Sequence, residues 1–318
     1  MLTIDVPGKL FIAGEYAVTR KGGLALVAAI KTDFSVTISK SDGGLSHLST
    51  NIGLPPLAFA LTGIEISADS PWRFALTALQ QMATCFQLTE AIDLHIQSGL
   101  GFGKEKLGYG SSAAVVVGVV QAVAEFFNLG LTSQEIFDVT GDVHFQVQGS
   151  GSMGDVAAIS HGGSIFYRNA DLIKTVSLPF DSYVARTHLS ASTHEKLSLS
   201  LSGSFYDQSD TIVEKLATTQ DFDKFKTLLL ENQQLLIDNL PADYVTPELA
   251  SALEIINKLP DFMAKISGAG FGENLIVFAT KGTDTQQLTA ALAAADVTLE
   301  KIEIADIYDE RTTSTSQG

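Results

Sequence analysis

A run of glycines followed at once by an apolar helix is the feature that most constrains how this chain folds. Glycines stand at positions 99, 101, 103, 108 and 110, and residues 111–127 then show helical periodicity. Glycine adopts backbone conformations that other residues avoid, so the main chain approaches a ligand closely there. The apolar run is about one turn short of a membrane span and contains Gln121 and Glu125. We therefore predict a functional loop that leads into a buried helix.

Short strands and helices alternate along the sequence, which indicates an α+β fold class. In the first half, the patterns predict strands at residues 2–6, 34–39 and 92–97, and helices at 72–86, 111–127 and 132–146. In the second half, they predict strands at 164–167, 174–178, 183–189, 262–267, 275–279 and 298–304, and helices at 207–219, 221–239, 247–258 and 284–294. Such an order of strands and helices is typical of a ferredoxin-like domain.

The composition excludes several classes of protein. The 318 residues are 45% hydrophobic, enough for one large domain or two ordinary ones, and a formal charge of −16 argues against nucleic-acid binding. The single cysteine, Cys85, excludes an intramolecular disulfide and is predicted to be a core residue. The apolar N-terminus contains Pro7, Lys9 and Glu15 and lacks the basic start of a secretory signal, so we expect no membrane partner and a cytoplasmic location.

The segment 108–114, Gly-Tyr-Gly-Ser-Ser-Ala-Ala, is a candidate phosphate-binding loop. The exposed amides of a helix start attract negative charge, and Ser111 and Ser112 are able to cap the helix, bind a phosphate or ligate magnesium. The spacing matches neither GxxxxGK[ST] nor GxGxxG, and an N-capped core helix explains the same residues.

Lysines near this loop or the N-terminus are candidates for charge stabilisation. Lys104 and Lys106 precede the loop, and Lys9 belongs to the segment 7–16, Pro-Gly-Lys-Leu-Phe-Ile-Ala-Gly-Glu-Tyr. A lysine beside a phosphate loop neutralises charge that develops on a transferring phosphoryl group. The alternative for Lys9 is a solvated lysine, because we predict a strand followed by a loop at the N-terminus.

Two other segments carry candidate chemistry. The segment 151–158, Gly-Ser-Met-Gly-Asp-Val-Ala-Ala, places Asp155 at the entrance of an apolar stretch, where it is either a helix cap or a catalytic carboxylate. The segment 265–273, Lys-Ile-Ser-Gly-Ala-Gly-Phe-Gly-Glu, leads from a predicted strand into a second glycine-rich loop, which is either an anion site or a hairpin turn. The predicted helix at 72–86 either flanks an adenine or is a core helix, and the six histidines show no metal-ligand spacing.

The segments 7–16, 108–114 and 265–272 together resemble the three ordered signature motifs of the GHMP kinases, a superfamily that includes galactokinase and the homoserine, mevalonate and phosphomevalonate kinases. The segment 151–157 resembles the Gly-Ser-Met-Gly-Asp stretch of bacterial phosphomevalonate kinases, and so does the ending Tyr308-Asp309-Glu310-Arg311. The chain departs from the family at Phe271, where glycine is usual, at Glu273, where aspartate is usual, and at Tyr109, where leucine is common.

The resemblance implies the GHMP kinase fold. An N-terminal ATP-binding lobe, similar to domain 2 of ribosomal protein S5, is expected at residues 1–175, and a ferredoxin-like lobe at 176–318, with the active site between them. ATP is then expected along Gly108, Tyr109, Gly110, Ser111, Ser112 and Ala113, with Mg²⁺ at Ser112. Lys9, Lys106 and Asp155 take the catalytic places, and the substrate contacts fall on Gly151, Ser152, Ser267, Gly268, Ala269, Gly270 and Arg311.

The leading hypothesis is transfer of the γ-phosphoryl group of ATP to (R)-5-phosphomevalonate by a monomer or homodimer. A phosphate monoester has a second pKa of about 6, so Asp155 would mainly orient Lys9 and the metal. With an alcohol acceptor, as in a mevalonate kinase, Asp155 would be a better general base. Another GHMP small-molecule kinase and a catalytically silent sensor of nucleotide or metabolite are the remaining alternatives.

Overall fold

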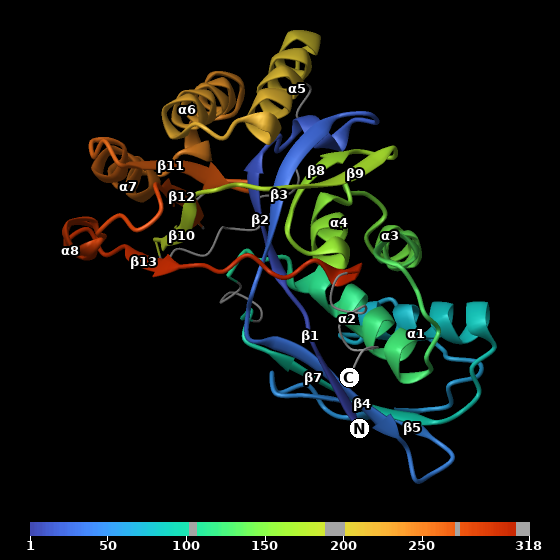
Figure 1. Cartoon of the computed structure of the whole chain (residues 1–318). Helices are drawn as coiled ribbons and strands as arrows, with labels where there is room; N and C mark the ends of the chain where they lie inside the picture. The colour runs from blue at the N-terminus through green and yellow to red at the C-terminus, as the bar shows by residue number, and fades with distance from the viewer. Residues whose placement is uncertain (102–106, 188–200, 271–273, 310–318) are drawn as a thin grey trace. The chain divides into compact units, whose positions relative to one another are not determined.

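A computed structural model describes residues 1–101, 107–187, 201–270 and 274–309 (Figure 1). The chain divides into two compact units, each assembled from segments that are distant in sequence. Unit 1 comprises Met1–Lys9, Ala29–Gly162 and Ala305–Gly318, and unit 2 comprises Leu10–Ala28 and Gly163–Ile304. The domain boundary between residues 175 and 176 stays a prediction.

Unit 1 is a five-stranded sheet covered by helices. The strand order is β1 (Leu2–Asp5), β4 (Phe34–Lys40), β7 (Ile92–Ser98), β5 (Ser46–Thr50) and β6 (Leu57–Phe59), antiparallel except for the parallel pair β5 and β7. The helices are α1 (Arg73–Phe86), α2 (Ser111–Phe126), α3 (Ser133–Gln148) and α4 (Gly154–His161). Helix α2 packs on β1 and β4, and α1, α3 and α4 pack around α2 (Figure 1). This central place explains why α2 is apolar on nearly every side.

Unit 2 contains two four-stranded sheets. One has the order β2 (Gly8–Ala13), β3 (Leu24–Ile30), β8 (Ser164–Arg168) and β9 (Leu172–Val176), and the other β11 (Phe262–Ser267), β12 (Asn274–Ala279), β10 (Asp181–Arg186) and β13 (Thr298–Lys301). Its helices are α5 (Gly203–Thr218), α6 (Phe222–Asn239), α7 (Pro247–Asn257) and α8 (Gln286–Ala293), with short 3₁₀ turns η1 (Ala17–Thr19) and η3 (Ala242–Tyr244). Helices α6 and α7 pack on β11, and α8 packs on β13.

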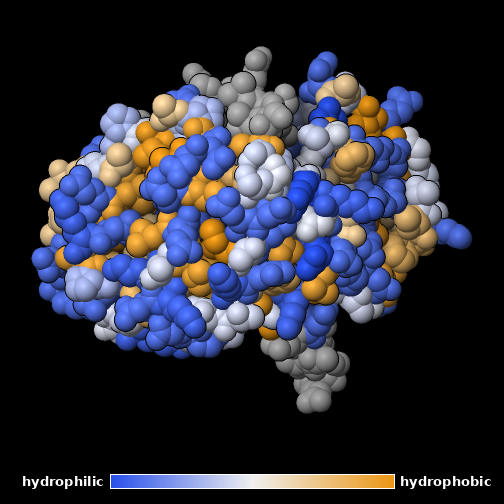
Figure 2. Space-filling model, turned by 90° about the horizontal axis from the view of Figure 1, so that it is seen from above, coloured by the Kyte–Doolittle hydropathy of each residue, from blue (hydrophilic) through white to orange (hydrophobic). Residues whose placement is uncertain are grey.

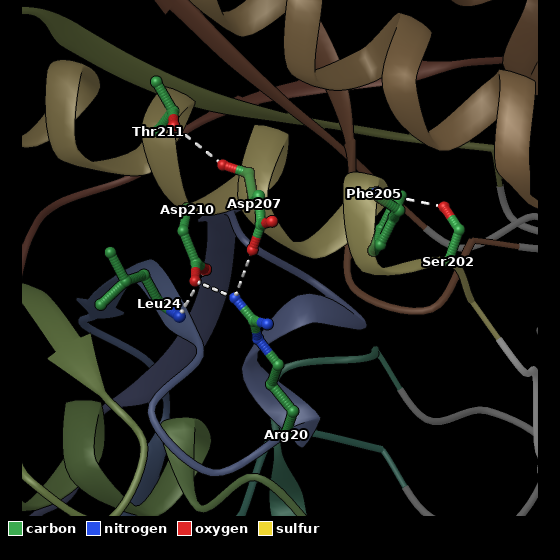
Figure 3. A network of polar contacts seen from close by, with 7 residues as sticks. All are labelled: Arg20, Leu24, Ser202, Phe205, Asp207, Asp210 and Thr211. Carbon is green, nitrogen blue, oxygen red and sulfur yellow. Dashed lines mark hydrogen bonds and ion pairs between the residues drawn. The ribbon is translucent and has the colours of Figure 1, made fainter.

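A polar network ties the connection between β2 and β3 to helix α5 (Figure 3). The Arg20 guanidinium donates to Asp210 at 2.6 Å and to Asp207 at 3.4 Å, and the other carboxylate oxygen of Asp210 accepts from the amide of Leu24 at 2.9 Å. The guanidinium carbon also lies 4.8 Å from the ring centroid of Tyr206. The connection between β2 and β3 is therefore held against α5 at two points, Arg20 and Leu24.

Every helix predicted from the sequence is present, although α5 begins at Gly203 rather than at residue 207. The predicted strands are also present, with small shifts such as β9 at Leu172–Val176 rather than 174–178. Residues 188–189 lie outside the described residues. The predicted N-terminal loop is wrong, because β2 occupies Gly8–Ala13, and β3, β5 and β6 were not predicted. Cys85 is exposed on α1, so the core placement is also wrong.

The surface is mixed in character. Figure 2 shows hydrophobic residues in small groups between hydrophilic ones on the face that it displays. The exposed large hydrophobic side chains among the described residues are scattered over several elements, including Leu45, Phe145, Leu172, Leu230 and Ile237. Within the described part of the chain, no helix combines the length and the apolar character that crossing a membrane requires.

Candidate active site

The loop before α2 presents free amide groups. Gly108 and Gly110 have φ values of 74° and 80°, a conformation that L-residues with a side chain rarely adopt. Gly110 is the N-cap residue of α2, and no side chain caps the helix there. Among the described residues, the amides of Ser111, Ser112 and Ala113 have no hydrogen-bond acceptor. Such a helix start favours an anion, because its unpaired N–H groups and the helix dipole act together.

Lys9 lies directly on this loop. Its backbone amide donates to the carbonyl of Tyr109 at 2.9 Å, and its ammonium donates to the carbonyl of Gly108 at 2.9 Å. A Cβ atom at Gly110 would lie 3.0 Å from Cγ of Lys9, so the lysine stem runs along the loop. The structure therefore brings the first and second glycine-containing segments together within unit 1, and Lys9 is not a solvated loop lysine.

Asp155 lies in the first turn of α4 and is half-buried. Its Oδ1 accepts from the amide of Val156 at 2.9 Å, and the N-cap residue of the helix is Met153 rather than Asp155. Ile159 lies on the same helix face one turn later, and its Cδ1 would be 3.7 Å from a Cβ atom at Gly110. The face of α4 that carries Asp155 is thus the face that packs toward the loop.

Gly151 and Ser152 precede α4. Gly151 is exposed with a φ of 147°, and the Ser152 hydroxyl accepts from the amide of Gly154 at 3.3 Å. Met153 has a φ of 59°, which is unusual for a residue with a side chain. Ser152 therefore lies in a strained turn that leads directly into the first turn of α4, where Asp155 lies. A substrate contact by Gly151 or Ser152 stays a prediction.

The loop after β11 forms a second set of free amides, in unit 2. Gly268 and Gly270 have φ values of 81° and 84°, whereas Ala269 between them does not have a positive φ. Among the described residues, the amides of Ala269 and Gly270 donate no hydrogen bond. Successive amides with alternating φ signs form a concave nest that favours anions. The anion-site interpretation of this loop therefore has a geometric basis, which a plain hairpin turn would not provide.

A buried ion pair lies beside this second loop, and sequence reasoning assigned it no role. The Lys265 ammonium donates to Oε1 of Glu15 at 2.6 Å, and the two side chains are 0% and 3% exposed. Burial lowers the pKa of Lys265, and the Glu15 carboxylate opposes that shift. Both residues belong to glycine-containing segments that the sequence already marked as functional, but nothing in the sequence indicated that the two side chains meet.

A pocket of about 360 Å³ opens beside the start of α2 in unit 1. Ser111, Ser112 and Val115 of α2 line one side, and Trp72 and Phe74 line another. Most of α1 is a core helix, as one of the two alternatives held, but its first turn borders this pocket. The lining is mainly apolar with a few polar groups, as is usual for sites that hold a planar ligand.

The described residues contain no group of three or more His, Cys, Asp or Glu side chains placed to hold a metal ion. Ser112 is half-buried at the start of α2, where its hydroxyl is a suitable oxygen ligand for Mg²⁺. In nucleotide-dependent enzymes, Mg²⁺ is commonly held by one or two protein groups together with substrate phosphates. The residues present fit that arrangement better than an all-protein cage.

Several residues singled out in the sequence lie outside the described residues: Lys104, Lys106, Phe271, Glu273, Glu310 and Arg311. Tyr308 lies near the far end of α2, because its hydroxyl donates to Glu125 at 3.4 Å. Glu125 follows Ser112 by 13 residues, or about 20 Å of helix. The catalytic role of Lys106 and the substrate contact of Arg311 stay predictions.

Two family models match the sequence. Residues 72–163 match the model described as GHMP kinases N terminal domain, and residues 212–297 match GHMP kinases C terminal. Together they cover more than half of the chain. The chain belongs to the GHMP kinase superfamily. The resemblance and the fold class inferred from the motifs are therefore confirmed: this GHMP kinase has the superfamily's fold, with N- and C-terminal domains.

Relatives of this GHMP kinase carry two different names. A phosphomevalonate kinase from Streptomyces sp. strain CL190 is 32% identical over 182 residues, 52% of this chain and 49% of that protein. The chain thus spans about half the length of that relative. A mevalonate kinase from Saccharolobus solfataricus is 25% identical over 289 residues, 87% of this chain and 89% of that protein. The names support a kinase without deciding its substrate.

A solved structure shows the same fold. The Streptococcus pneumoniae phosphomevalonate kinase in complex with phosphomevalonate and AMPPNP superposes with a TM-score of 0.85 over 96% of this chain and 100% of that chain, at 24% identity. Identity at this level supports the fold of this GHMP kinase alone.

Proposed function

We propose that this GHMP kinase transfers the γ-phosphoryl group of ATP to (R)-5-phosphomevalonate, giving 5-diphosphomevalonate and ADP. One observation carries the proposal: the ammonium of Lys9 lies on a loop whose next three amides, at the start of α2, donate to no other described residue. A cation and oriented amides at one place suit the phosphate chain of a nucleotide. The ATP analogue bound by the Streptococcus pneumoniae relative supports the choice of ATP.

The nucleoside end of ATP is assigned to the pocket beside α2. Ser111 and Ser112 belong both to the free amide group and to the pocket lining, so one ligand reaches both. Trp72 and Phe74 supply aromatic surface for a purine ring. We therefore place the phosphates along Gly108 to Ala113 and the base near Trp72.

The acceptor's anionic group is assigned to the nest in unit 2. The free amides of Ala269 and Gly270 suit a phosphate or carboxylate, and Ser267 and Gly268 complete the loop. Phosphomevalonate is preferred because of the Gly-Ser-Met-Gly-Asp segment at 151–155 and because one relative is a phosphomevalonate kinase. Mevalonate kinases among the relatives make mevalonate the second candidate.

In the reaction, a phosphate oxygen of the acceptor forms a bond to the γ-phosphorus while the bond from that phosphorus to the β,γ-bridging oxygen breaks. The acceptor phosphate is mostly ionised at neutral pH, since its second pKa is about 6. Asp155 therefore orients neighbouring groups rather than removing a proton, and Lys9 stabilises charge on the transferring group, with Lys106 as a second lysine. Mg²⁺ at Ser112 would neutralise charge on the nucleotide phosphates when bound. Cytoplasmic location and a monomeric or homodimeric state stay predictions.

The test is ADP release by the purified protein with MgATP and, separately, phosphomevalonate, mevalonate or diphosphomevalonate. Turnover with phosphomevalonate alone is expected. Lys9→Met should lower kcat by about 100-fold or more, because preorganised charge is lost from the transition state. Lys40→Met, which removes an exposed lysine of β4 paired with Glu90 at 2.7 Å, is the matched control and should change kcat less than about twofold.

The other outcomes separate the alternatives. Turnover with mevalonate alone would replace the proposed acceptor and restore Asp155 as a general base. No turnover with any acceptor, together with tight ATP binding, would favour a nucleotide or metabolite sensor.

A further inference from the structure

Three consecutive residues of the loop after β11 are each hydrogen-bonded to residues 11–16. The Ser267 hydroxyl donates to the carbonyl of Phe11 at 2.8 Å, and the amide of Gly268 donates to Oε1 of Glu15 at 3.3 Å. The carbonyl of Ala269 accepts from the hydroxyl of Tyr16 at 2.6 Å. These bonds fix the backbone of the loop, while the amides of Ala269 and Gly270 donate no hydrogen bond to another described residue.

The central bond depends on the buried ion pair. Oε1 of Glu15 accepts from both Gly268 and the Lys265 ammonium, and the same ammonium donates to the carbonyl of Ile266 at 2.7 Å. Lys265 is the third residue from the end of β11, so its ammonium holds the end of the strand where the loop begins. One carboxylate oxygen thus joins the strand end and the loop.

A buried ion pair such as that of Glu15 and Lys265 usually adds little to the free energy of unfolding. Two charges taken out of water lose more hydration than their attraction returns in many proteins, and a well-packed hydrophobic pair is often as stable or more so. In addition, Oε2 of Glu15 is buried and has no hydrogen-bond partner among the described residues. What the ion pair provides that hydrophobic residues cannot is a directional acceptor for the amide of Gly268.

We propose that Glu15 and Lys265 are positioning residues that hold the Ser267 to Gly270 loop in the conformation that binds the acceptor's anionic group. The acceptor part rests on the proposed function, whereas the loop part does not. In the ion-paired state, the alternating φ signs of residues 268–270 are maintained and the nest exists before the acceptor arrives. Preorganisation of this kind lowers the cost of binding.

The test compares Lys265→Met, Glu15→Gln and the double variant Glu15→Leu/Lys265→Met with the wild type. Lys226→Met is the matched control, because the Lys226 ammonium donates to the carbonyls of Leu259, Pro260 and Phe262 around the opposite end of β11. The first measurement is amide hydrogen exchange of peptides covering the loop. The second is the KM for phosphomevalonate and for ATP. Urea unfolding of each variant supplies the stability baseline.

Among the loop amides, that of Gly268 donates to Glu15, so we expect its exchange to be about tenfold faster in each variant of the pair than in Lys226→Met of similar stability. The KM for phosphomevalonate should rise about tenfold while that for ATP changes less than about twofold. The double variant should regain stability but keep both defects. Loop exchange and acceptor KM at wild-type values in the double variant would overturn the proposal. If the wild type turns over no acceptor, the proposed function fails, and the exchange result still decides whether the pair holds the loop.

Discussion

Gly268 and Gly270 are suited to a comparison of alanine variants that tests the backbone conformation of the anion-binding loop after β11. Both have φ values near 80°, yet their surroundings differ. A Cβ atom at Gly268 would have no heavy atom within 4 Å, whereas one at Gly270 would overlap Cδ2 and Cε2 of Tyr244, a buried residue of the unit 2 core. Alanine at the two positions therefore separates backbone strain from steric overlap.

The magnitudes follow from these two terms. A left-handed conformation costs an L-residue about 1–2 kcal/mol, so Gly268→Ala should lower the free energy of unfolding by that amount. Gly270→Ala adds the cost of displacing a buried aromatic ring, about 1–3 kcal/mol, for a total of about 2–5 kcal/mol. Since domains are commonly stable by about 5–15 kcal/mol, the second loss is a large fraction of the whole.

The assay is urea unfolding followed by circular dichroism, with the slope of the unfolding free energy against urea compared between variants. An unchanged slope with a lower midpoint assigns the loss to the folded state. Equal losses in the two variants would refute the reasoning, because the overlap with Tyr244 would then contribute nothing. A loss near zero in both would refute the positive φ values themselves.

Three further predictions concern other sites. Asp309→Ala should lower the free energy of unfolding by about 1 kcal/mol, since Asp309 accepts from the amide and the hydroxyl of Ser133 at the start of α3. Urea unfolding measures this loss, and an unchanged free energy of unfolding would contradict a stabilising role of these two bonds. Burial lowers the pKa of His161, so as pH falls the imidazole of the unfolded chain binds a proton before that of the folded protein, and stability should fall as pH drops through about 6.5. His161→Gln should reduce this loss of stability, measured as the urea midpoint between about pH 5 and 8. Burial, and then Glu15, raises the pKa of Tyr16 to about 12, so its contribution to stability is present below about pH 10 and is lost as pH rises toward 12. Burial also raises the pKa of Tyr183 and Tyr244, so Tyr16→Phe should reduce the late phenol titration seen by ultraviolet absorbance without abolishing it.

The parts of the site that follow from local sequence were predictable. Glycines at 108 and 110 before an apolar run indicated a loop and a buried helix, and both are present because turn chemistry and helical periodicity act over a few residues. Strand β3, Leu24–Ile30, was missed because all seven of its residues are buried, so no alternation of apolar and polar residues marks it.

The parts of the site that depend on distant contacts could not be predicted. Glu15 and Lys265 are 250 residues apart, and neither residue type nor spacing shows that their side chains meet. Likewise, the contact of Lys9 with Gly108 joins residues 99 positions apart, and a lysine in a predicted loop is most simply taken as solvated. Packing of the whole chain, rather than local propensity, decides these contacts.

The C-terminal segment also has a consequence for biosynthesis. Unit 1 includes residues 305–309, which follow unit 2 in the sequence: the amide of Ala305 donates to the carbonyl of Ala29 at 2.9 Å, and Asp309, 176 residues downstream of Ser133, accepts from Ser133 in the first turn of α3. At about 5–20 residues per second, a ribosome takes roughly 10–35 seconds to translate that interval. Helix α3 has its own capping box, formed by Thr132 and Glu135, but it lacks the additional bonds from Asp309 until residues 163–304 of unit 2 have been synthesised. Unit 1 is therefore expected to complete its fold only after residues 163–304 of unit 2 have been synthesised.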